Sequence, residues 1–311
     1  TVSGSGDVTL ELDGKNELTG GNSGDYGTRG ITSGKGKLTI QGKEGSSLST
    51  TGGSGTKGGS FGICASTGKL DLVDATVTAT GGVGGGGSGI SANDEVNIKN
   101  SKLTAKGGGQ LHPGEDTSTG GGLGIYLFGK GKVVVGEGSE VIAIGGDDKA
   151  VKRKAQGGNA LRVWGTGVDS GYEVQKGGKL TVIGGNAESE NGNATGGHAS
   201  VYNCQVTVKE GTTTALGGKA ESDANTAVNG SSIKPSWSDK IDLSVETGGT
   251  LVTAMPGERD GKGNGITGNV EIKTDGGKIE EMENAKVVKK DDGTVNVVGD
   301  LVGIKQDGHS Y

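Results

Sequence analysis

The chain has 311 residues, of which 69 are glycine, while only 29% are hydrophobic and 3% aromatic. Its 31 basic and 37 acidic residues are interspersed and give a formal net charge of −6, so no basic block indicates a nucleic-acid partner. No apolar run approaches the roughly 18 residues of a membrane span, and two cysteines are too few for a disulfide framework.

The first expected strand is VTLEL (8–12), and after it a three-part scheme repeats along the chain. Each repeat begins with a short Gly-Ile segment, found at residues 30–31, 62–63, 89–90, 124–125 and 265–266. A strand with alternating apolar residues follows, as in KLTI (37–40), KLDL (69–72), EVNI (95–98), KVVV (132–135), QVTV (205–208), DLSV (242–245) and VEI (270–272).

The third part of each repeat is a second alternating strand that closes on a glycine pair. It reads LSTTGG (48–53), VTATGG (77–82), LTAKGG (103–108), VIAIGG (141–146), LTVIGG (180–185) and TALGG (214–218). The first glycine of each pair stands at 52, 81, 107, 145, 184 and 217, so the intervals are 29, 26, 38, 39 and 33 residues. A unit that recurs with variable insertions is typical of a solenoid.

Three short strands per repeat predict an all-β fold, a right-handed parallel β-helix (β-solenoid) of about nine coils. We expect one inward column of core side chains, formed by Leu38, Leu70, Val96, Val133 and Val206. The glycine pairs are expected to supply φ values that other residues tolerate poorly. The alternatives are a β-sandwich built from the same strands and, because the hydrophobic content is low, disorder.

Two features complete the predicted architecture. The insertions at 110–122, 147–158 and 186–195 are expected to leave the coils as polar loops. KVVKKDDGTVNVV (286–298) reads as an antiparallel hairpin around Asp292-Gly293. We therefore expect one domain over residues 1–311, with coils over 1–284 and a C-terminal cap over 285–311.

This style of repeat, with Gly-Ile, KLTI-like and VTATGG-like segments, resembles Gly-rich parallel β-helix proteins on the surface of gut-type bacteria, some of them carbohydrate-binding or adhesin-like. The resemblance covers most of the chain and implies a secreted or cell-wall-attached protein and a glycan partner. It carries over no functional residue. The chain begins at Thr1 with no signal-like segment, which fits a mature or excised portion.

Catalytic and metal-binding patterns are weak, and we expect no enzyme activity, no cofactor and no metal. The only Asp pairs are Asp147-Asp148 and Asp291-Asp292, and both fall in expected loops or turns. The three histidines stand far apart in sequence. Cys64 and Cys204 fall in repeats expected to lie roughly 19 Å apart, so both are predicted to be free thiols.

The scarce aromatic residues give the one candidate site. Tyr126, Trp164 and Tyr202 each follow an aliphatic residue at a spacing of 38, and Phe128 and Tyr172 lie nearby in sequence. If the three aliphatic residues point inward, the three rings stack outward on successive coils and form a ligand-binding strip. The alternative is an internal ladder covered by the long loops.

These observations predict a monomeric, non-catalytic, extracellular or wall-attached module that binds a glycan or another cell-surface polymer. A structural spacer is the alternative, and a β-helical polysaccharide lyase or hydrolase is the less favoured one.

Overall fold

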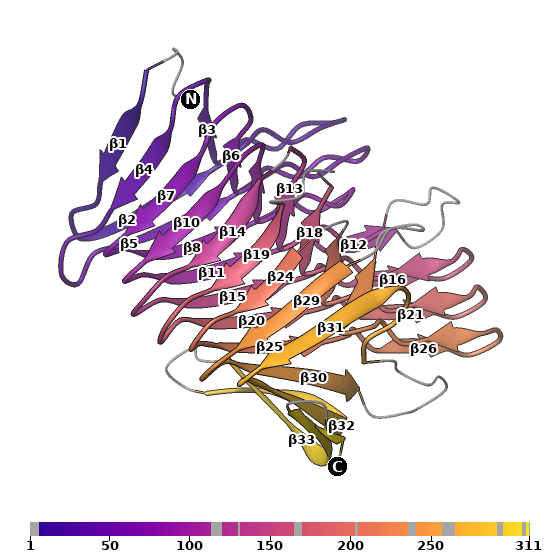
Figure 1. Cartoon of the computed structure of the whole chain (residues 1–311). Coiled ribbons are helices and arrows are strands. Elements are labelled where there is room, and N and C mark those ends of the chain that lie inside the picture. Colours follow the sequence, from indigo (N-terminus) through magenta and orange to yellow (C-terminus); the bar gives the residue numbers. More distant parts are fainter. Residues whose placement is uncertain are drawn as a thin grey trace.

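The computed structural model describes residues 6–112, 120–129, 131–164, 170–202, 205–235, 241–256, 265–290, 295–306 and 309–310. Within these residues the fold is all-β and built from long parallel sheets, an arrangement compatible with the expected β-solenoid (Figure 1). The described part contains no helix, and so no helix able to cross a membrane.

Successive repeats stack their strands side by side in the first long sheet, which has nine strands. In spatial order these are β1 (Val8–Glu11), β4 (Leu38–Gln41), β7 (Leu70–Val73), β10 (Val96–Lys99), β14 (Lys132–Val135), β19 (Gly171–Val174), β24 (Gln205–Val208), β29 (Ile241–Glu246) and β31 (Val270–Asp275). VTLEL therefore begins the stack, because β1 pairs with β4 in parallel, Val8 opposite Leu38.

The second long sheet receives the next strand of each repeat and ends in the C-terminal strands. Its order is β2 (Lys15–Thr19), β5 (Ser47–Thr51), β8 (Thr76–Thr80), β11 (Lys102–Lys106), β15 (Glu140–Ile144), β20 (Lys179–Ile183), β25 (Thr212–Leu216), β30 (Thr250–Pro256), β32 (Lys278–Lys289), β33 (Val295–Gln306) and β34 (His309–Ser310). β32 and β33 pair antiparallel, Lys289 opposite Val295, which confirms the predicted hairpin.

The third long sheet contains the Gly-Ile segments. Its order is β28 (Ile233–Pro235), β23 (Ser200–Tyr202), β18 (Leu161–Val163), β13 (Ile125–Leu127), β9 (Ile90–Ala92), β6 (Ile63–Ala65) and β3 (Ile31–Ser33). Inward side chains of all three long sheets form one continuous buried core. Such a narrow core needs few apolar residues per strand, which explains the low hydrophobic content.

The predicted inward column is confirmed. Leu38, Leu70, Val96 and Val133 are consecutive Cα partners in the first sheet, and each is at most 1% exposed. Tyr172 stands between Val133 and Val206 in the same column, and its ring is fully buried.

The insertions at 147–158 and 186–195 are not the plain loops expected from the sequence. With residues 219–228 they form a side arm of two further parallel sheets, whose strands project from the main stack in Figure 1. The strands are β12 (Gln110–His112), β16 (Asp148–Ala150), β21 (Ala187–Ser189) and β26 (Ala220–Ser222) in one sheet, and β17 (Ala155–Gln156), β22 (Ala194–Thr195) and β27 (Ala227–Val228) in the other.

Alanines form the hydrophobic part of the arm's interior. They are Ala150, Ala155, Ala187, Ala194, Ala220 and Ala227. Arg153 and Asp148 form a buried ion pair within the arm, with Nη2–Oδ1 at 2.8 Å and Nη1–Oδ2 at 3.0 Å. A backbone group also satisfies this carboxylate, since the Gln156 N–H donates to Asp148 Oδ2.

The glycine pairs serve a different purpose from the one expected. They form a glycine neck between the main stack and the side arm, comprising residues 107–108, 121–122, 145–146, 157–158, 184–185, 196–197, 217–218 and 230. The two limbs of the neck hydrogen-bond to each other from repeat to repeat, as in Gly158 N–H to Gly146 O and Gly185 N–H to Gly158 O, both 2.8 Å. None of these glycines has a positive φ. They are required because a Cβ would collide with the neighbouring backbone.

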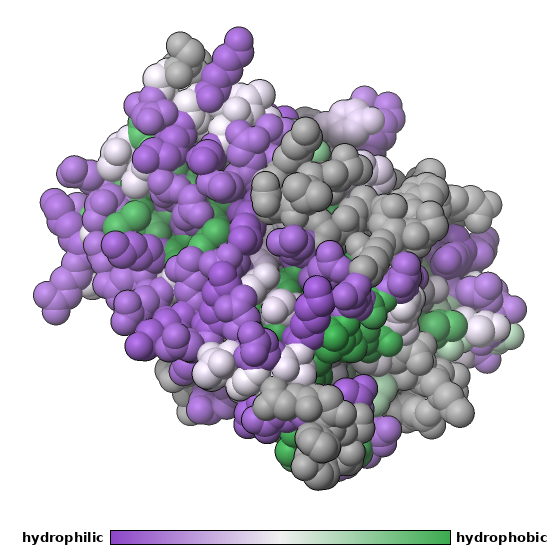
Figure 2. Space-filling model, viewed as in Figure 1, coloured by the Kyte–Doolittle hydropathy of each residue, from purple (hydrophilic) through white to green (hydrophobic). Residues whose placement is uncertain are grey.

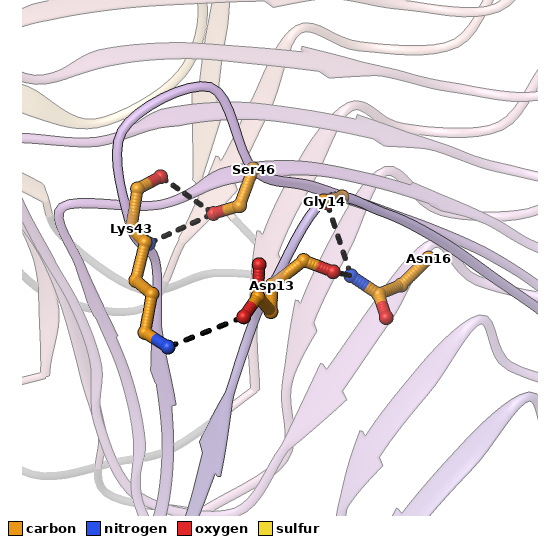
Figure 3. Close-up of polar contacts among 5 residues, drawn as sticks. All are labelled: Asp13, Gly14, Asn16, Lys43 and Ser46. Atoms are coloured by element: carbon orange, nitrogen blue, oxygen red, sulfur yellow. Dashed lines mark hydrogen bonds and ion pairs between the residues drawn. The ribbon is translucent and has the colours of Figure 1, made fainter.

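Residues with a positive φ recur instead at the corner between the first and second sheets. They are Gly14, Gly45, Asp74, Asn100, Gly138, Gly177, Glu210, Gly248 and Gly276. Figure 3 shows the first of these corners, where the Asn16 amide donates to Gly14 O (3.2 Å) and Lys43 Nζ lies 3.4 Å from Asp13 Oδ2. In the next repeat Ser46 Oγ accepts from Lys43 N–H and donates to Lys43 O.

Buried apolar side chains also occur on the outward side of the second sheet, on β15, β20, β25 and β30. Ile142, Ile183, Leu216 and Ala254 form a small second core with Ala285 and Val295 of the hairpin. The hairpin thus covers the side of the stack as well as extending it. The coloured part of the face seen in Figure 2 is mainly hydrophilic, with hydrophobic patches among the polar side chains.

Candidate functional site

The outer face of the third long sheet carries the candidate site. In β3, β13 and β18 the first and third side chains are buried and the middle one is partly exposed on the outer face. The middle residues of the registered strands form a row on this face: Thr32, Cys64, Ser91, Tyr126, Arg162, Val201 and Lys234. Cys64, Ser91 and Val201 are nevertheless buried.

Aromatic residues concentrate beside this row. The structure describes six aromatic side chains, and all except the buried Tyr172 lie along the third sheet: Tyr26, Phe61, Tyr126, Phe128 and Trp164. Together with Arg29 and Arg162 they form what we call the aromatic–arginine face.

The first cluster of this face surrounds a cavity of about 610 Å³ near β3 and β6. Tyr26, which is 63% exposed, and Phe61 line it together with Arg29. The Arg29 guanidinium carbon lies 5.6 Å from the centre of the Phe61 ring, within the range of a cation–π contact. Hydroxyl groups of Thr28, Thr32 and Ser60 complete the lining and offer hydrogen bonds to a polar ligand.

The second cluster lies at β13 and β18. The rings of Tyr126 and Phe128 are 5.9 Å apart and tilted by 45°. On the next strand the Arg162 guanidinium carbon sits 4.4 Å from the centre of the Trp164 ring, and Trp164 is 44% exposed. A large aromatic surface is therefore available to solvent beside a cation.

Arg162 is only partly solvated. Its Nε is buried and has no hydrogen-bond partner in the described part of the chain. Burial lowers the pKa of the guanidinium from its usual value, and the neighbouring Tyr126 opposes this shift. Arg162 also lines a cavity of about 260 Å³ with Gln156, Asn159 and glycines of the neck.

His198 borders the same sheet and holds a fixed, neutral ring. Its Nδ1 accepts the Ser231 N–H at 2.9 Å, and its backbone N–H donates to Asn159 Oδ1 at 2.9 Å. Burial, followed by the charge of Lys234, lowers the pKa of His198 to about 4. The ring is consequently uncharged at neutral pH.

The predicted strip of three stacked rings is wrong in register. Tyr126 pairs with Arg162, which in turn pairs with Val201, so Trp164 and Tyr202 do not follow Tyr126 in one row. Trp164 instead follows Val163 by one residue, at the position next to Phe128. The 38-residue spacing is misleading because the insertions that separate these strands differ in length.

The remaining predicted residues divide between surface and core. Phe128 joins the second cluster. Tyr172 does not, since its fully buried ring fills the core, where burial raises its pKa and a hydrogen bond with Thr213 opposes this. The Tyr202 backbone pairs with Pro235 in β28, and its side chain lies outside the described residues.

Sequence reasoning missed the first cluster. Arg29 and Phe61 directly precede the Gly-Ile segments at 30–31 and 62–63, so a comparison of the residues at that point of each repeat could have found them. Cys64 is a free thiol, as predicted, and its burial raises its pKa. Cys204, the other predicted free thiol, lies outside the described residues.

The described residues contain no group of three or more His, Cys, Asp or Glu side chains arranged to hold a metal ion. In the glycine-rich segment at 20–25 the Asp25 carboxylate lies 2.9 Å from Lys57 Nζ. Comparison with known proteins gives no further assignment, because no family model, curated protein or solved structure matches the chain.

Proposed function

We propose that this chain is a non-catalytic binding or adhesin-like module, extracellular or attached to a cell wall, that binds a glycan through the aromatic–arginine face. The observation that carries the proposal is the exposed ring of Trp164, stacked with Arg162 beside Tyr126 and Phe128. Flat aromatic surfaces flanked by hydrogen-bonding groups suit the apolar faces and hydroxyl groups of sugars.

The proposal includes the finer architecture and context expected from the sequence. These are a single right-handed β-helix of about nine coils, a monomeric state, and kinship with Gly-rich surface proteins of gut-type bacteria. The nine strands of the first sheet and the parallel register of its pairs support the coil number.

Glycan-panel binding with a Trp164→Ala variant tests the function. If Trp164 packs on a sugar, its loss weakens binding by about 2 kcal/mol or more, roughly 30-fold, as is typical of an aromatic hot spot. Leu18→Ala is the matched control, because Leu18 is similarly exposed (42%) on β2, in a different sheet. Equal binding by wild type and Trp164→Ala across all bound glycans would contradict the proposal.

A structural spacer is the second candidate, favoured by the long uninterrupted parallel sheets. Fluorescence quenching by acrylamide in a Trp237→Phe background, which leaves Trp164 as the only tryptophan, separates the two. Ligand-dependent protection of Trp164 supports a binding module. Unchanged quenching with every member of the panel supports the spacer.

A polysaccharide lyase or hydrolase is less well supported. Of the Asp147-Asp148 pair, the Asp148 carboxylate is fully buried and bound in two hydrogen bonds to Arg153, so it is committed to the side arm. Asp291 and Asp292 lie outside the described residues.

A further inference from the structure

The arginines of this chain are few and differ in their partners. Of the four, Arg259 lies outside the described residues and Arg153 is paired with Asp148. Arg29 and Arg162 have no carboxylate partner among the described residues, and each lies against an aromatic ring instead. Both belong to the aromatic–arginine face, and each lines its own cavity.

We propose that the two unpaired arginines make this face a receptor for acidic glycans whose sugar units carry a carboxylate, that is, uronic-acid polymers. The inference rests on the proposed glycan-binding function and names its ligand class. A guanidinium stacked on a ring still presents its N–H edge, and that planar fork matches a carboxylate in two parallel hydrogen bonds.

The surroundings of Arg162 strengthen the case for an anionic partner. Its guanidinium is partly desolvated, and its buried Nε lacks a partner among the described residues. A cation in this state gains more from a charged acceptor than a fully hydrated one does, because water screens the contact less. The protein carries a net charge of −6, so a general attraction for polyanions is not expected and binding must be local.

Neutral hydrogen-bonding groups stand beside each arginine, as a sugar requires. The first cavity offers hydroxyl groups of Thr32 and Ser60, and the second offers the side-chain amides of Gln156 and Asn159. Asn159 Oδ1 already accepts the backbone N–H of His198, which fixes the amide and leaves its NH₂ group to donate. Carboxylate and hydroxyl recognition therefore coexist in both cavities.

The spacing of the two clusters favours a polymer over a single sugar. Arg29 lies at the level of β3 and Arg162 on β18, four strand steps apart in the third sheet. At about 4.8 Å per step the separation along the stack is roughly 19 Å. An acidic chain lying along the sheet can engage both arginines at once, so the second contact becomes intramolecular and raises the overall affinity.

The experiment measures binding of the whole chain to polygalacturonate, to alginate, to fully methyl-esterified polygalacturonate and to a sulfated glycan at about 0.15 M salt, where long-range attraction is screened. The variants are Arg162→Gln, Arg29→Gln and the double substitution. Lys179→Gln is the charge-matched control, because Lys179 is exposed on β20 in the second sheet. Circular dichroism verifies that each variant is folded.

We expect at least one polyuronate to bind tenfold or more tightly than the methyl ester, and each arginine variant to lose at least tenfold while Lys179→Gln binds like wild type. Equal binding of acid and ester, undiminished binding by the double variant, or tighter binding of the sulfated glycan would each overturn the carboxylate assignment. The proposed function fails separately, if no polymer, acidic or neutral, binds in a way that depends on Trp164.

Discussion

Replacing Gly185 with alanine tests why the chain uses so many glycine pairs. Gly185 belongs to the glycine neck, where its N–H donates to Gly158 O and its own carbonyl accepts from Gly197 N–H, both at 2.8 Å. A Cβ at Gly185 would lie 2.0 Å from Gly146 O and 2.6 Å from the carbonyl carbon of that residue. Since both colliding atoms are backbone, no side chain can rotate away to make room.

The expected loss of stability follows from how far the neighbouring limbs of the neck must separate. Restoring an ordinary contact requires a separation of well over 1 Å between neighbouring limbs, which breaks the two hydrogen bonds of Gly185. Buried backbone groups left without partners cost about 1–3 kcal/mol each, so we expect Gly185→Ala to lower the free energy of unfolding by about 3–5 kcal/mol. Denaturant unfolding followed by far-ultraviolet circular dichroism measures it.

Two control glycines separate crowding from backbone angle. A Cβ at Gly24 would meet no atom within 4 Å, and this residue has no positive φ, so Gly24→Ala is expected to change stability by no more than about 0.5 kcal/mol. Gly177 is equally open but has φ of +70°, so its alanine variant loses about 1–2 kcal/mol from the left-handed angle alone. If Gly185→Ala unfolds at the same denaturant concentration as Gly24→Ala, the crowding argument is refuted.

Two further predictions concern the core and the neutral histidine. Leu70→Ala, between Leu38 and Val96 in the inward column, should lower the free energy of unfolding by about 2–5 kcal/mol through the cavity it leaves, measured by the same denaturant titration. His198, with a pKa of about 4 in the folded chain, should make stability fall as pH drops from about 6.5 toward 4, by up to about 3 kcal/mol, because only the unfolded chain takes up its proton in that window. His198→Gln should flatten this part of the pH profile; an unchanged profile would show that the ring does not control it.

The main stack could be predicted from the sequence because strand alternation reports directly on burial. In KLDL (69–72), for example, Leu70 and Leu72 are both fully buried, and Asp71 between them lies on the outer side. The closing hairpin followed from the same signal, with two alternating segments on either side of Asp292-Gly293. In both cases one local pattern decides one local structure.

The side arm was missed because its strands carry almost no hydrophobic signal. Segments such as AESENGNAT (187–195) are polar, and the only hydrophobic side chains among them that enter the interior are alanines. At the alanine positions a single methyl group suffices, because the glycine neck holds the two limbs in backbone contact. The crowded glycines and the buried alanines thus both result from the close approach of the two limbs of the arm. Neither produces the alternation of large apolar residues that marks an ordinary strand.

The register of the aromatic residues could not be obtained from spacing, because each insertion changes the length of its own repeat. Tyr126 pairs with Arg162, 36 residues later, and Arg162 pairs with Val201, 39 residues later, so a constant spacing of 38 aligns the wrong side chains. The difference matters chemically. Three stacked rings would offer a neutral platform, whereas the structure places the partly buried Arg162 guanidinium over the Trp164 ring, on the strand next to Tyr126. That cation is the basis of the proposed selectivity for charged sugars. Comparing the binding of a polyuronate with that of its methyl ester therefore tests the proposal more directly than a test of aromatic stacking alone.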